Sequence, residues 1–353
     1  SQFSLSYDKL ILSPGAAPVR PNIPGIERAL SLRTVEDVKA MAQIMSTNPK
    51  SAVIIGGGFI GLELAENLVH KRIPTVVIEA TDQVMAPLDS EMVSFVHNEI
   101  RKHEVDLRLG SSVTHIKDDS VVLANGDEIP ADVVVAAIGV RPETTLAVNA
   151  GLKIGPRGGI AVDEYNLTSN PDIYAVGDAT EKHDALDNSA TLIPLANIAN
   201  RQGRVVADLI CGKKIRAVAS QATAIVKIFD LTVATTGWNE KKAKAAGLDY
   251  VVVHTHPSHH AGYYPGAQGM SIKIIVDKKT QEILGAQAVG REGVDKRIDV
   301  IATAMRGGLN APELADLELA YAPPYGSAKD PVNMLGYISE NVLNGVTPTV
   351  QWS

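Results

Sequence analysis

As far as Ile210, short apolar runs alternate along the chain with segments in which apolar residues recur at helical spacing. Apolar runs such as Ser51–Ile55 and Pro74–Glu79 predict buried strands, whereas Phe59–His70 carries apolar residues at helical spacing. Because strand and helix patterns alternate, we expect a parallel sheet with helices on its faces. The same patterns predict further strands at 7–13, 105–109, 113–117, 121–123, 132–138 and 172–176, and helices at 35–44, 89–103 and 194–210.

The pattern changes after Gly212-Lys213-Lys214, where strand patterns begin to dominate. This change predicts a second domain of the α+β class. Its expected strands span 224–229, 232–236, 250–254, 271–276 and 283–289, and its expected helices span 293–306 and 330–343.

Proline and glycine mark the connections between these elements. Pro18, Pro21 and Pro24 predict a linker, because proline has no N–H to donate to a strand ladder and fixes an extended path. Asn125-Gly126 predicts the tight turn of a hairpin.

Composition and charge narrow the class of protein. The 353 residues predict two or three domains at about 150 residues each. The 33 Lys and Arg residues against 40 Asp and Glu residues give a net charge of −7, without the basic excess of a nucleic-acid binder. The apolar run Val133–Val140 is far shorter than the ~20 residues that a membrane helix needs. The single cysteine, Cys211, excludes an intrachain disulfide and fits a reducing, cytoplasmic compartment.

The most informative motif is the glycine-rich segment Gly56–Gly61, which has the spacing G-x-G-x-x-G between a predicted strand and a predicted helix. Gly56 permits a tight turn, Gly58 lets a pyrophosphate approach the backbone, and Gly61 lets the helix pack closely on the strand. The motif predicts a dinucleotide site at a helix N-terminus. A glycine-rich structural turn is the alternative.

An acidic residue, Glu79, ends the next predicted strand. A carboxylate at this position accepts hydrogen bonds from the ribose hydroxyls of an adenosine and repels a 2′-phosphate. No arginine follows it in Ala80-Thr81-Asp82. We therefore expect NADH to be preferred over NADPH, with a solvated charge at a strand end as the alternative.

Several segments beyond the glycine motif extend this pattern over nearly the whole chain. They are Tyr7–Ala16, Gly56–Glu63, Ala137–Pro142, Ile173–Asp178, Gln202–Arg204 and Tyr321–Asn333. In these segments the chain resembles the flavin-dependent pyridine nucleotide-disulfide oxidoreductases. It is most similar to their coenzyme A-disulfide reductase, persulfide reductase and NADH oxidase branch.

The resemblance implies an α/β fold with Rossmann-like FAD and NAD domains, the FAD domain being incomplete, followed by an α+β dimerisation domain. The expected segments are 1–47 for the remainder of the first half of the FAD domain and a linker, 48–145 for the NAD-binding domain, 146–216 for the second part of the FAD domain, 217–345 for the α+β interface and dimerisation domain, and 346–353 for a linker or tail.

The resemblance also implies two cofactors, FAD and NADH. Asp178 would hold the ribityl chain, and the helix that begins near Pro194 would face the pyrimidine end of the flavin. Phe59 would be the aromatic gate that nicotinamide displaces, and Glu63, one helical turn on, would lie beside the nicotinamide. The full set of expected cofactor residues is Gly15, Gly56, Gly58, Phe59, Ile60, Gly61, Glu79, Gly139, Gly177, Asp178, Pro194, Leu195 and Ala196.

Two tyrosines, Tyr263 and Tyr321, resemble those that act on the thiol substrate from the partner subunit of a homodimer. A phenol can donate a proton to a leaving thiolate or hold the sulfur in place. The alternative is that they pack in an interface, as tyrosines often do. Tyr264 and Tyr325 are close enough in sequence to be confused with them.

The chain departs from the family in two features: it lacks a second glycine motif for the FAD pyrophosphate, and it lacks the redox cysteine that follows that motif. Cys211 lies at the end of a helix and is expected to be a structural or surface thiol. We expect that the amino-terminal half of the FAD domain is absent from this chain. Some members of the branch continue into a rhodanese domain beyond the position of residue 353.

Two clusters of polar side chains have weaker implications. For the histidines we expect no metal site, because no cysteine or carboxylate lies among them, and binding of an anionic thiol such as a coenzyme A phosphate is the alternative. They are His254, His256, His259 and His260. Arg291, Lys296 and Arg297 are expected to form a solvated helix face, with an anion-binding patch as the alternative.

These observations lead to one main functional hypothesis and two alternatives. The main hypothesis is an NADH-dependent flavoenzyme that reduces a disulfide, persulfide or polysulfide of coenzyme A or another low-molecular-weight thiol, through a cysteine that this chain does not contain. The alternatives are an NADH oxidase or peroxidase of the same fold and a non-catalytic NADH-binding or dimerisation module. None of these hypotheses involves nucleic acid or a membrane.

Overall fold

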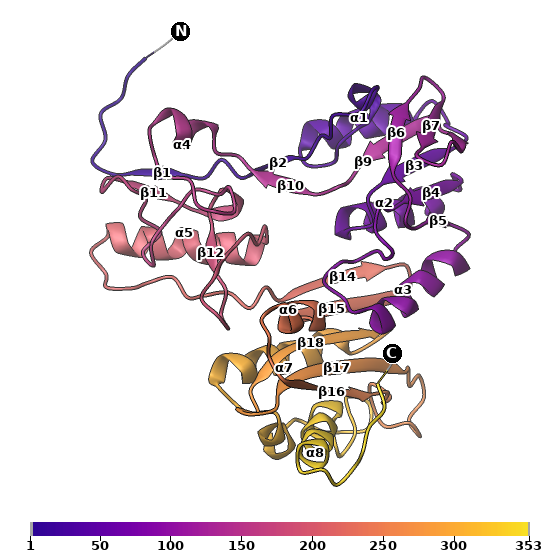
Figure 1. Cartoon of the computed structure of the whole chain (residues 1–353), viewed down its shortest axis with the longest axis vertical. Helices are drawn as coiled ribbons and strands as arrows, with labels where there is room; N and C mark the ends of the chain where they lie inside the picture. Colours follow the sequence, from indigo (N-terminus) through magenta and orange to yellow (C-terminus); the bar gives the residue numbers. More distant parts are fainter. Residues whose placement is uncertain (1–2, 352–353) are drawn as a thin grey trace. The chain divides into compact units, whose positions relative to one another are not determined.

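The computed structural model of the chain describes residues 3–351 (Figure 1). These residues form two compact units. One combines the residues up to 19 with 139–222, and the other combines 20–138 with the residues from 223 onward. The finer division into five segments stays a prediction.

The second unit contains the parallel sheet that the alternating patterns predict. Its strand order is β5-β4-β3-β9, and all three pairings are parallel. Helix α2 packs on β3 and β4, and α3 packs on β5. The strands are β3 (Ala52–Ile55), β4 (Thr75–Ile78), β5 (Asp106–Arg108) and β9 (Val133–Ala136), and the helices that precede or follow them are α1 (Val35–Met45), α2 (Phe59–His70) and α3 (Ser90–Lys102). The short η1 (Ile26–Arg28) precedes α1 in the same unit.

A small antiparallel sheet of order β6-β7-β8 belongs to the same unit. Its strands are β6 (Val113–Ile116), β7 (Ser120–Leu123) and β8 (Glu128–Pro130). The turn at Asn125-Gly126 joins β7 to β8, and Gly126 has a φ of 90°, which glycine adopts without strain. The predicted hairpin is therefore confirmed. Ile116 and Val121 from this sheet pack with Val53 and Ile55 of β3 in one apolar cluster.

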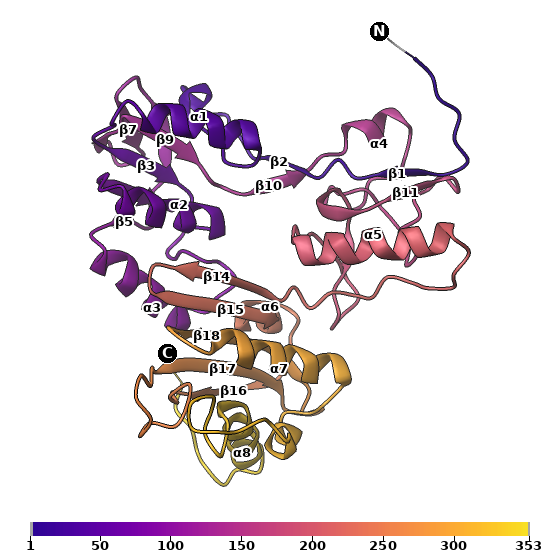
Figure 2. The ribbon, with the colours of Figure 1, turned by 180° about the vertical axis from the view of Figure 1, so that it is seen from behind.

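The C-terminal part of the unit is a five-stranded antiparallel sheet of order β14-β15-β18-β17-β16. Figures 1 and 2 show α7 lying along this sheet, where it contacts β15 and β18, and α8 contacts β16. The strands are β14 (Ala224–Ile228), β15 (Leu231–Gly237), β16 (Tyr250–Thr255), β17 (Met270–Asp277) and β18 (Ile283–Gly290). The helices are α6 (Glu240–Ala245), α7 (Val294–Gly307), the short η3 (Pro312–Asp316) and α8 (Pro331–Leu343).

The two larger sheets of this unit share a hydrophobic core. Leu62 and Leu68 of α2 belong to the same buried cluster as Val226 and Phe229 of the antiparallel sheet. Helix α2 contacts β14 directly. Since the apolar surface of each part is covered by the other, the parts on either side of residues 139–222 form one compact unit.

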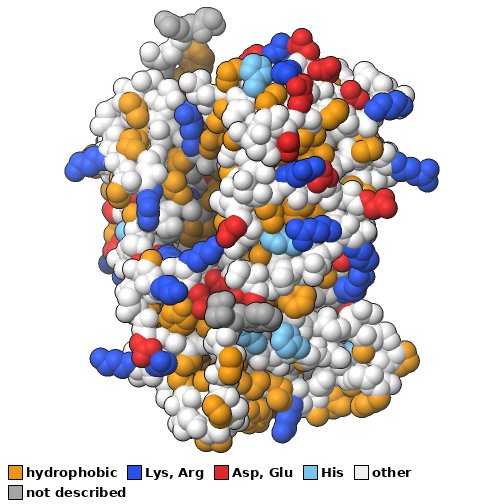
Figure 3. All heavy atoms as spheres, turned by 45° about the vertical axis from the view of Figure 1, so that its right-hand side comes forward, with side chains coloured by type: hydrophobic (Ala, Val, Ile, Leu, Met, Phe, Trp, Pro, Cys, Tyr) orange, Lys and Arg blue, Asp and Glu red, His pale blue; other side chains and the backbone are white. Residues whose placement is uncertain are grey.

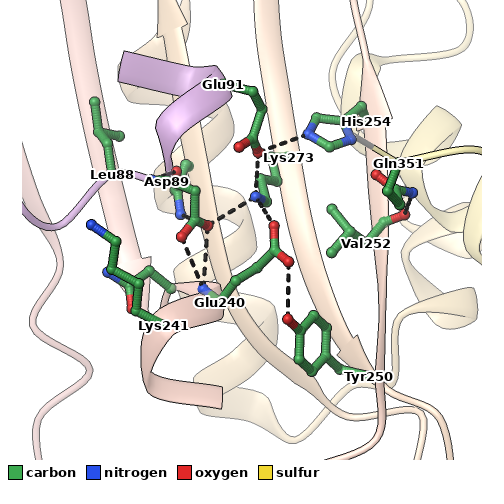
Figure 4. Close-up of polar contacts among 12 residues, drawn as sticks. Leu88, Asp89, Glu91, Glu240, Lys241, Tyr250, Val252, His254, Lys273 and Gln351 are labelled. Atoms are coloured by element: carbon green, nitrogen blue, oxygen red, sulfur yellow. Dashed lines mark hydrogen bonds and ion pairs between the residues drawn. The ribbon is translucent and has the colours of Figure 1, made fainter. Parts of the chain in front are cut away.

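A buried ion cluster also joins these parts (Figure 4). The fully buried ammonium of Lys273, on β17, binds the carboxylates of Asp89, Glu91 and Glu240, with 2.9 Å between its Nζ and Asp89 Oδ2. Asp89 and Glu91 begin α3, whereas Glu240 begins α6. His254 Nε2 lies 3.2 Å from Glu91 Oε1. These three carboxylates have the spacing of a metal site, and the ammonium of Lys273 is their cation.

The first unit is built from short elements. Strand β1 (Leu10–Leu12) pairs in parallel with β11 (Ile173–Ala175), and a small core with Ala147 and Ile160 lies beside them. The other elements are β2 (Ala16–Pro18), β10 (Val140–Pro142), α4 (Thr145–Asn149), η2 (Gly177–Ala179), β12 (Lys182–His183), β13 (Ala190–Thr191) and α5 (Ala196–Ile210).

Three predictions about this region are wrong in part. The strand expected at 7–13 spans only Leu10–Leu12 and is partly exposed, because β11 is its one strand partner among the described residues. Pro18 lies in a strand, β2, where a two-stranded ribbon tolerates its missing N–H. Helix α5 begins at Ala196 rather than Pro194, because Leu195 is extended and its N–H donates to Ile193 O.

The surface carries charges of both signs. On the face that Figure 3 shows, Lys and Arg side chains are interspersed with Asp and Glu side chains. Within residues 3–351, no helix is both long enough and apolar enough to cross a bilayer.

Candidate functional site

The glycine-rich turn lies at the carboxyl end of β3, where it leads directly into α2. Gly56 has a φ of 111°, and a Cβ on it would lie 2.5 Å from Ala137 O. A Cβ on Gly61 would lie 2.1 Å from Gly56 O, so the first turn of α2 packs directly against the glycine turn. The roles that the motif assigns to these two glycines therefore have a geometric basis.

The space at Gly58 has the features of an anion cradle. A Cβ built on Gly58 meets nothing within 4 Å, in contrast to Gly56 and Gly61. Gly58 is also the N-cap of α2, and no side chain of residues 3–351 caps this helix end. Open space next to the first N–H groups of a helix, with Phe59 and Ile60 following, fits the pyrophosphate of a dinucleotide.

The carboxylate of Glu79 lies beside this turn. Its Oε2 accepts a hydrogen bond from the Gly57 N–H at 2.8 Å, and its Oε1 accepts from the Thr81 N–H at 2.9 Å. The Thr81 hydroxyl donates to the same Oε1 at 2.9 Å. These bonds fix a half-buried negative charge at the end of β4, where the ribose-binding acid of such a site belongs.

Phe59 and Glu63 occupy one face at the start of α2. They are four residues apart on the helix, and Phe59 is half-buried whereas Glu63 is exposed. Desolvation by neighbouring atoms, together with the charge of Glu66, raises the pKa of Glu63 above its ordinary value. The Glu63 carboxyl therefore binds a proton more readily than an ordinary glutamate does.

In the other unit, the turn at Gly177 and Asp178 is held from two sides. The Gly177 N–H donates to Gln202 Oε1 of α5 at 2.9 Å, and Gly177 has a φ of 77°. The buried Lys182 Nζ donates to Gly177 O at 2.5 Å and to Thr180 O at 2.9 Å. The half-buried Asp178 therefore extends from a rigid turn, which fits a carboxylate that binds a ribityl hydroxyl.

Lys182 binds the turn that carries Asp178, and no sequence motif predicted this contact. Burial lowers the pKa of this amine to about 8, against an opposing effect of the Asp178 charge. Its ammonium group donates hydrogen bonds to two carbonyl groups at η2 and so stabilises the turn that carries Asp178. A lone lysine after a Gly-Asp pair has no pattern that would have revealed this contact.

The N-terminus of α5 belongs to the same unit and contacts η2. Leu195 is its N-cap, Ala196 is its first residue, and no side chain caps this end. Helix N–H groups without a side-chain cap favour a partner that carries negative charge, such as the pyrimidine end of a reduced flavin. Pro194 lies before the cap and is exposed.

Gly15 and Gly139 lie next to the β2–β10 ribbon, although they are far apart in sequence. Gly15 has a φ of 75° and Gly139 a φ of 106°, so both adopt the left-handed conformation that favours glycine. Gly15 O accepts from the Glu143 N–H at 3.0 Å, and Gly139 O accepts from the Val19 N–H at 2.9 Å. The two expected cofactor glycines thus flank one ribbon.

The two candidate catalytic tyrosines form a pair. The hydroxyl oxygens of Tyr263 and Tyr321 are 3.3 Å apart, and their side chains are 77% and 48% exposed. Tyr263 lies in the loop between β16 and β17, and Tyr321 lies in the loop between η3 and α8. The hydrogen bond with Tyr263 raises the pKa of Tyr321. Tyr264 instead packs edge-on against the buried His260 at 5.7 Å between ring centroids.

An ion pair connects the two tyrosine loops. Arg297 of α7 is 1% exposed, which contradicts the expectation of a solvated helix face. Its Nη2 donates to Asp330 Oδ2 at 2.8 Å and to His259 O at 2.7 Å. The periodic pattern of α7 places Arg297 among apolar residues, and this was the signal that its charge obscured.

The remaining candidates have structural partners. His254 contacts Glu91, His256 Nδ1 lies 2.9 Å from Ser271 Oγ, and His259 Nδ1 accepts from the Gln268 N–H at 3.0 Å. Among the described residues, the histidine cluster does not assemble the ligand set of a metal site. Cys211 is the exposed C-cap of α5.

Comparison with known protein families accounts for most of the chain. Residues 1–203 match the family described as pyridine nucleotide-disulphide oxidoreductase, and residues 223–331 match the dimerisation domain of such proteins. The chain belongs to the pyridine nucleotide-disulphide oxidoreductase family. Proteins of this family use FAD together with NADH, and the open helix ends at Gly58 and Leu195 fit these two cofactors.

Three relatives illustrate the similarity. The coenzyme A disulfide reductase of Staphylococcus aureus is 35% identical over 340 residues, which are 95% of this chain and 76% of that protein. The structure of reduced Bacillus anthracis CoADR-RHD matches 98% of this chain with a TM-score of 0.96 and 49% identity. The NAD-dependent persulfide reductase of A. fulgidus matches 98% of it with a TM-score of 0.95 and 41% identity. This oxidoreductase chain spans 64% and 65% of those two solved chains.

Proposed function

We propose that this chain serves an NADH-dependent flavoenzyme that reduces the disulfide or persulfide of a low-molecular-weight thiol of the coenzyme A type. The relatives named for coenzyme A disulfide and for persulfide reduction support this substrate class. The single cysteine is compatible with work in a reducing compartment such as the cytoplasm.

The observation that carries the proposal is the tyrosine pair. Residues 58 positions apart in sequence bring two phenol oxygens to 3.3 Å from each other on an exposed surface. Buried aromatic packing does not explain this arrangement, because both side chains are exposed rather than packed in a core. A hydrogen-bonded phenol pair is suited to donate a proton to a thiolate as it leaves a disulfide.

The proposed binding roles follow from the geometry of each turn. The backbone at Gly58 and the start of α2 would bind the NADH pyrophosphate, and Glu79 would accept hydrogen bonds from the adenosine ribose. Asp178 would bind the ribityl chain of FAD, and the start of α5 would face its pyrimidine end. FAD held by these residues would supply two-electron chemistry between NADH and the sulfur substrate.

The proposed proton chemistry uses side chains of this chain. Reduction of a disulfide by NADH consumes one proton and yields two thiols and NAD⁺. The Tyr263–Tyr321 pair would supply a proton to the leaving sulfur and regain one from solvent, to which both side chains are open. Phe59 would cover the flavin until nicotinamide displaces it, while Glu63 would lie beside the nicotinamide. Cys211 has no step in this proposal.

We also propose a homodimer in which the tyrosines of one subunit act at the site of its partner. The match of residues 223–331 to a dimerisation domain supports this arrangement. Such an arrangement would make the sulfur site incomplete in a single subunit.

The test is a comparison of electron acceptors. NADH oxidation by the protein is measured anaerobically with coenzyme A disulfide and with coenzyme A persulfide, and in a separate reaction with oxygen alone. We expect a sulfur acceptor to support turnover faster than oxygen, and Tyr263→Phe and Tyr321→Phe to slow it by about 100-fold each. Faster turnover with oxygen, unaffected by either substitution, would contradict the proposal and favour an oxidase.

A further inference from the structure

The loops that carry Tyr263 and Tyr321 share one buried anchor. Arg297, in the first turn of α7, donates from Nη2 to His259 O at 2.7 Å, four residues before Tyr263. The same Nη2 donates to Asp330 Oδ2 at 2.8 Å, and Nε donates to Asp330 Oδ1 at 3.3 Å. Asp330 ends the loop that contains Tyr321. One guanidinium group therefore binds both loops.

A second contact joins the loops closer to the tyrosines. The Ala261 N–H donates to Gly326 O at 2.8 Å, and Ala261 O accepts from the Tyr264 N–H at 2.9 Å. Gly326 lies close to the anchor, since a Cβ on it would lie 3.5 Å from Asp330 Oδ2 and 3.8 Å from Arg297 Nη2. The backbone contact and the ion pair therefore form one continuous connection.

Packing against neighbouring residues does little to fix the side chains of Tyr263 and Tyr321. They are 77% and 48% exposed, so little packing fixes their hydroxyls. By contrast, Arg297 is 1% exposed and Asp330 is 3% exposed, and the fork of the guanidinium holds the carboxylate in one orientation. The distance between the two hydroxyls consequently depends on how the two loop backbones are held together.

Asp330 also starts α8, which ties the anchor to the core of the domain. Its side chain accepts from the Val332 N–H and forms a capping box with Asn333. Lys296 adds a weaker contact, with its Nζ 3.8 Å from Asp330 Oδ2. The position of the Tyr321 loop thus depends on the helices α7 and α8 through this carboxylate.

We propose that Arg297 and Asp330 are positioning residues that hold the Tyr263 and Tyr321 hydroxyls within hydrogen-bond distance for proton transfer to the substrate sulfur. Both side chains are buried and bind the two loops, so they act through the tyrosines. This inference rests on the proposed function of the tyrosine pair. A buried ion pair is a costly way to stabilise a fold and is better suited to fixing a register, which is the role given to it here.

The test compares two conservative variants with a reference and a control. Asp330→Asn keeps the shape and a capping oxygen but removes the charge, and Arg297→Lys keeps the charge but loses the fork. Tyr263→Phe is the reference for a broken hydroxyl pair. Arg291→Lys is the control, because it alters another Arg–Asp pair, with Asp230, on the same domain. Circular dichroism and thermal unfolding establish that each variant is folded.

The first readout is independent of activity. Ultraviolet difference absorbance follows tyrosine ionisation across alkaline pH in the full chain, with Tyr321→Phe subtracted to isolate Tyr321. Removal of the Tyr263 hydroxyl is expected to lower the Tyr321 pKa, because that hydrogen bond raises it. We expect Asp330→Asn and Arg297→Lys to lower the Tyr321 pKa as well, and Arg291→Lys to leave it unchanged.

The second readout separates positioning from binding in the assembled enzyme. With coenzyme A disulfide or persulfide, kcat is expected to fall about 10-fold to 100-fold in Asp330→Asn and Arg297→Lys, while KM changes little. Flavin reduction by NADH alone is expected to keep its wild-type rate. If Arg297→Lys does not fold, Asp330→Asn decides the question by itself.

The outcomes distinguish this inference from the function on which it rests. An unchanged Tyr321 ionisation in folded Asp330→Asn overturns the positioning role, even if Tyr263→Phe abolishes turnover. Conversely, unchanged turnover in Tyr263→Phe contradicts the proposed proton transfer. It then also contradicts a role of Arg297 and Asp330 in that transfer. A shifted ionisation with a fall in kcat in both anchor variants supports the inference.

Discussion

At the scale of single residues, the site depends on charges that the backbone holds in place. The carboxylate of Glu79 accepts hydrogen bonds from the N–H groups of Gly57 and Thr81, which hold it beside the glycine turn. Lys182 closes the turn that carries Asp178. In both cases a hydrogen bond between a side chain and the backbone fixes the position of a carboxylate or of the turn that carries it.

The first prediction concerns the choice of nucleotide. Replacing Glu79 with Ala and Ala80 with Arg removes the repulsion of a 2′-phosphate and adds a positive partner for it. We expect the ratio of kcat/KM for NADPH to that for NADH to rise by about 10-fold or more. Asp82→Ala, which removes an exposed carboxylate nearby, is the control and should leave the ratio unchanged. An unaltered ratio in the double variant would place the ribose elsewhere.

The second prediction concerns the ion cluster at Lys273. Burial alone would raise the pKa of Glu91, but hydrogen bonds from His254 and Lys273 lower it to about 2. A carboxyl whose folded pKa is lowered stabilises the fold above its ordinary pKa of 4.5, and this contribution is lost as the pH falls toward 2. We therefore expect the free energy of unfolding, measured with urea, to decrease steadily below about pH 5.

Substitution of the central cation gives a sharper version of this test. Lys273→Met leaves three neighbouring carboxylates without their buried ammonium and is expected to cost about 3–5 kcal/mol of stability at neutral pH. The deficit should shrink at low pH, where the carboxylates are protonated. Lys278→Met, which breaks an exposed pair with Asp249, should cost at most about 1 kcal/mol. Equal effects of both substitutions would contradict the role of the cluster.

At the scale of elements, helix ends and tight contacts determine what each segment can bind. Helix α2 begins without a side-chain cap, whereas α1 and α8 have capping boxes. The uncapped end faces open space at Gly58, and its neighbour Gly61 is packed against the glycine turn. The open space at Gly58, rather than the lack of a cap alone, distinguishes this helix end, because α3 and α7 also begin without a side-chain cap.

The third prediction tests the close approach of α2. Gly61→Ala would place a Cβ at 2.1 Å from Gly56 O and is expected to destabilise the protein by about 1–3 kcal/mol and weaken NADH binding. Gly203→Ala is the matched control, because it lies inside α5 with nothing within 4 Å of the new Cβ. That control should be neutral or stabilising by up to about 1 kcal/mol. Thermal unfolding and NADH titration measure both effects.

The elements that local patterns describe well could be predicted from sequence. Helix α2 has the predicted bounds, and the alternation of strands and helices predicted the parallel sheet. The strand predicted over residues 7–13 is too long, because apolar content alone does not reveal that β1 pairs with one strand among the described residues. The helical spacing of apolar residues in α7 indicates that Arg297 faces the core, but its partner Asp330 lies 33 residues away and the local pattern does not reveal it.

At the scale of the whole molecule, the chain joins two matched regions of one family, residues 1–203 and 223–331. The compact unit that contains the glycine turn also contains the tyrosine pair, and a shared core and the Lys273 cluster connect its two larger sheets. The roles that the family motifs indicate for the residues at these sites stay predictions. The buried connections between distant segments required three-dimensional coordinates, because each one depends on contacts that sequence spacing does not encode.

We propose that electrons pass from NADH through a flavin to a sulfur substrate. The most direct measurement is the visible absorption spectrum of the protein under anaerobic conditions, first with NADH and then with coenzyme A disulfide or persulfide. We expect a flavin band that NADH bleaches and that the sulfur substrate restores. A reduced flavin that oxygen reoxidises but neither sulfur substrate does, or a protein without a flavin band, would contradict it.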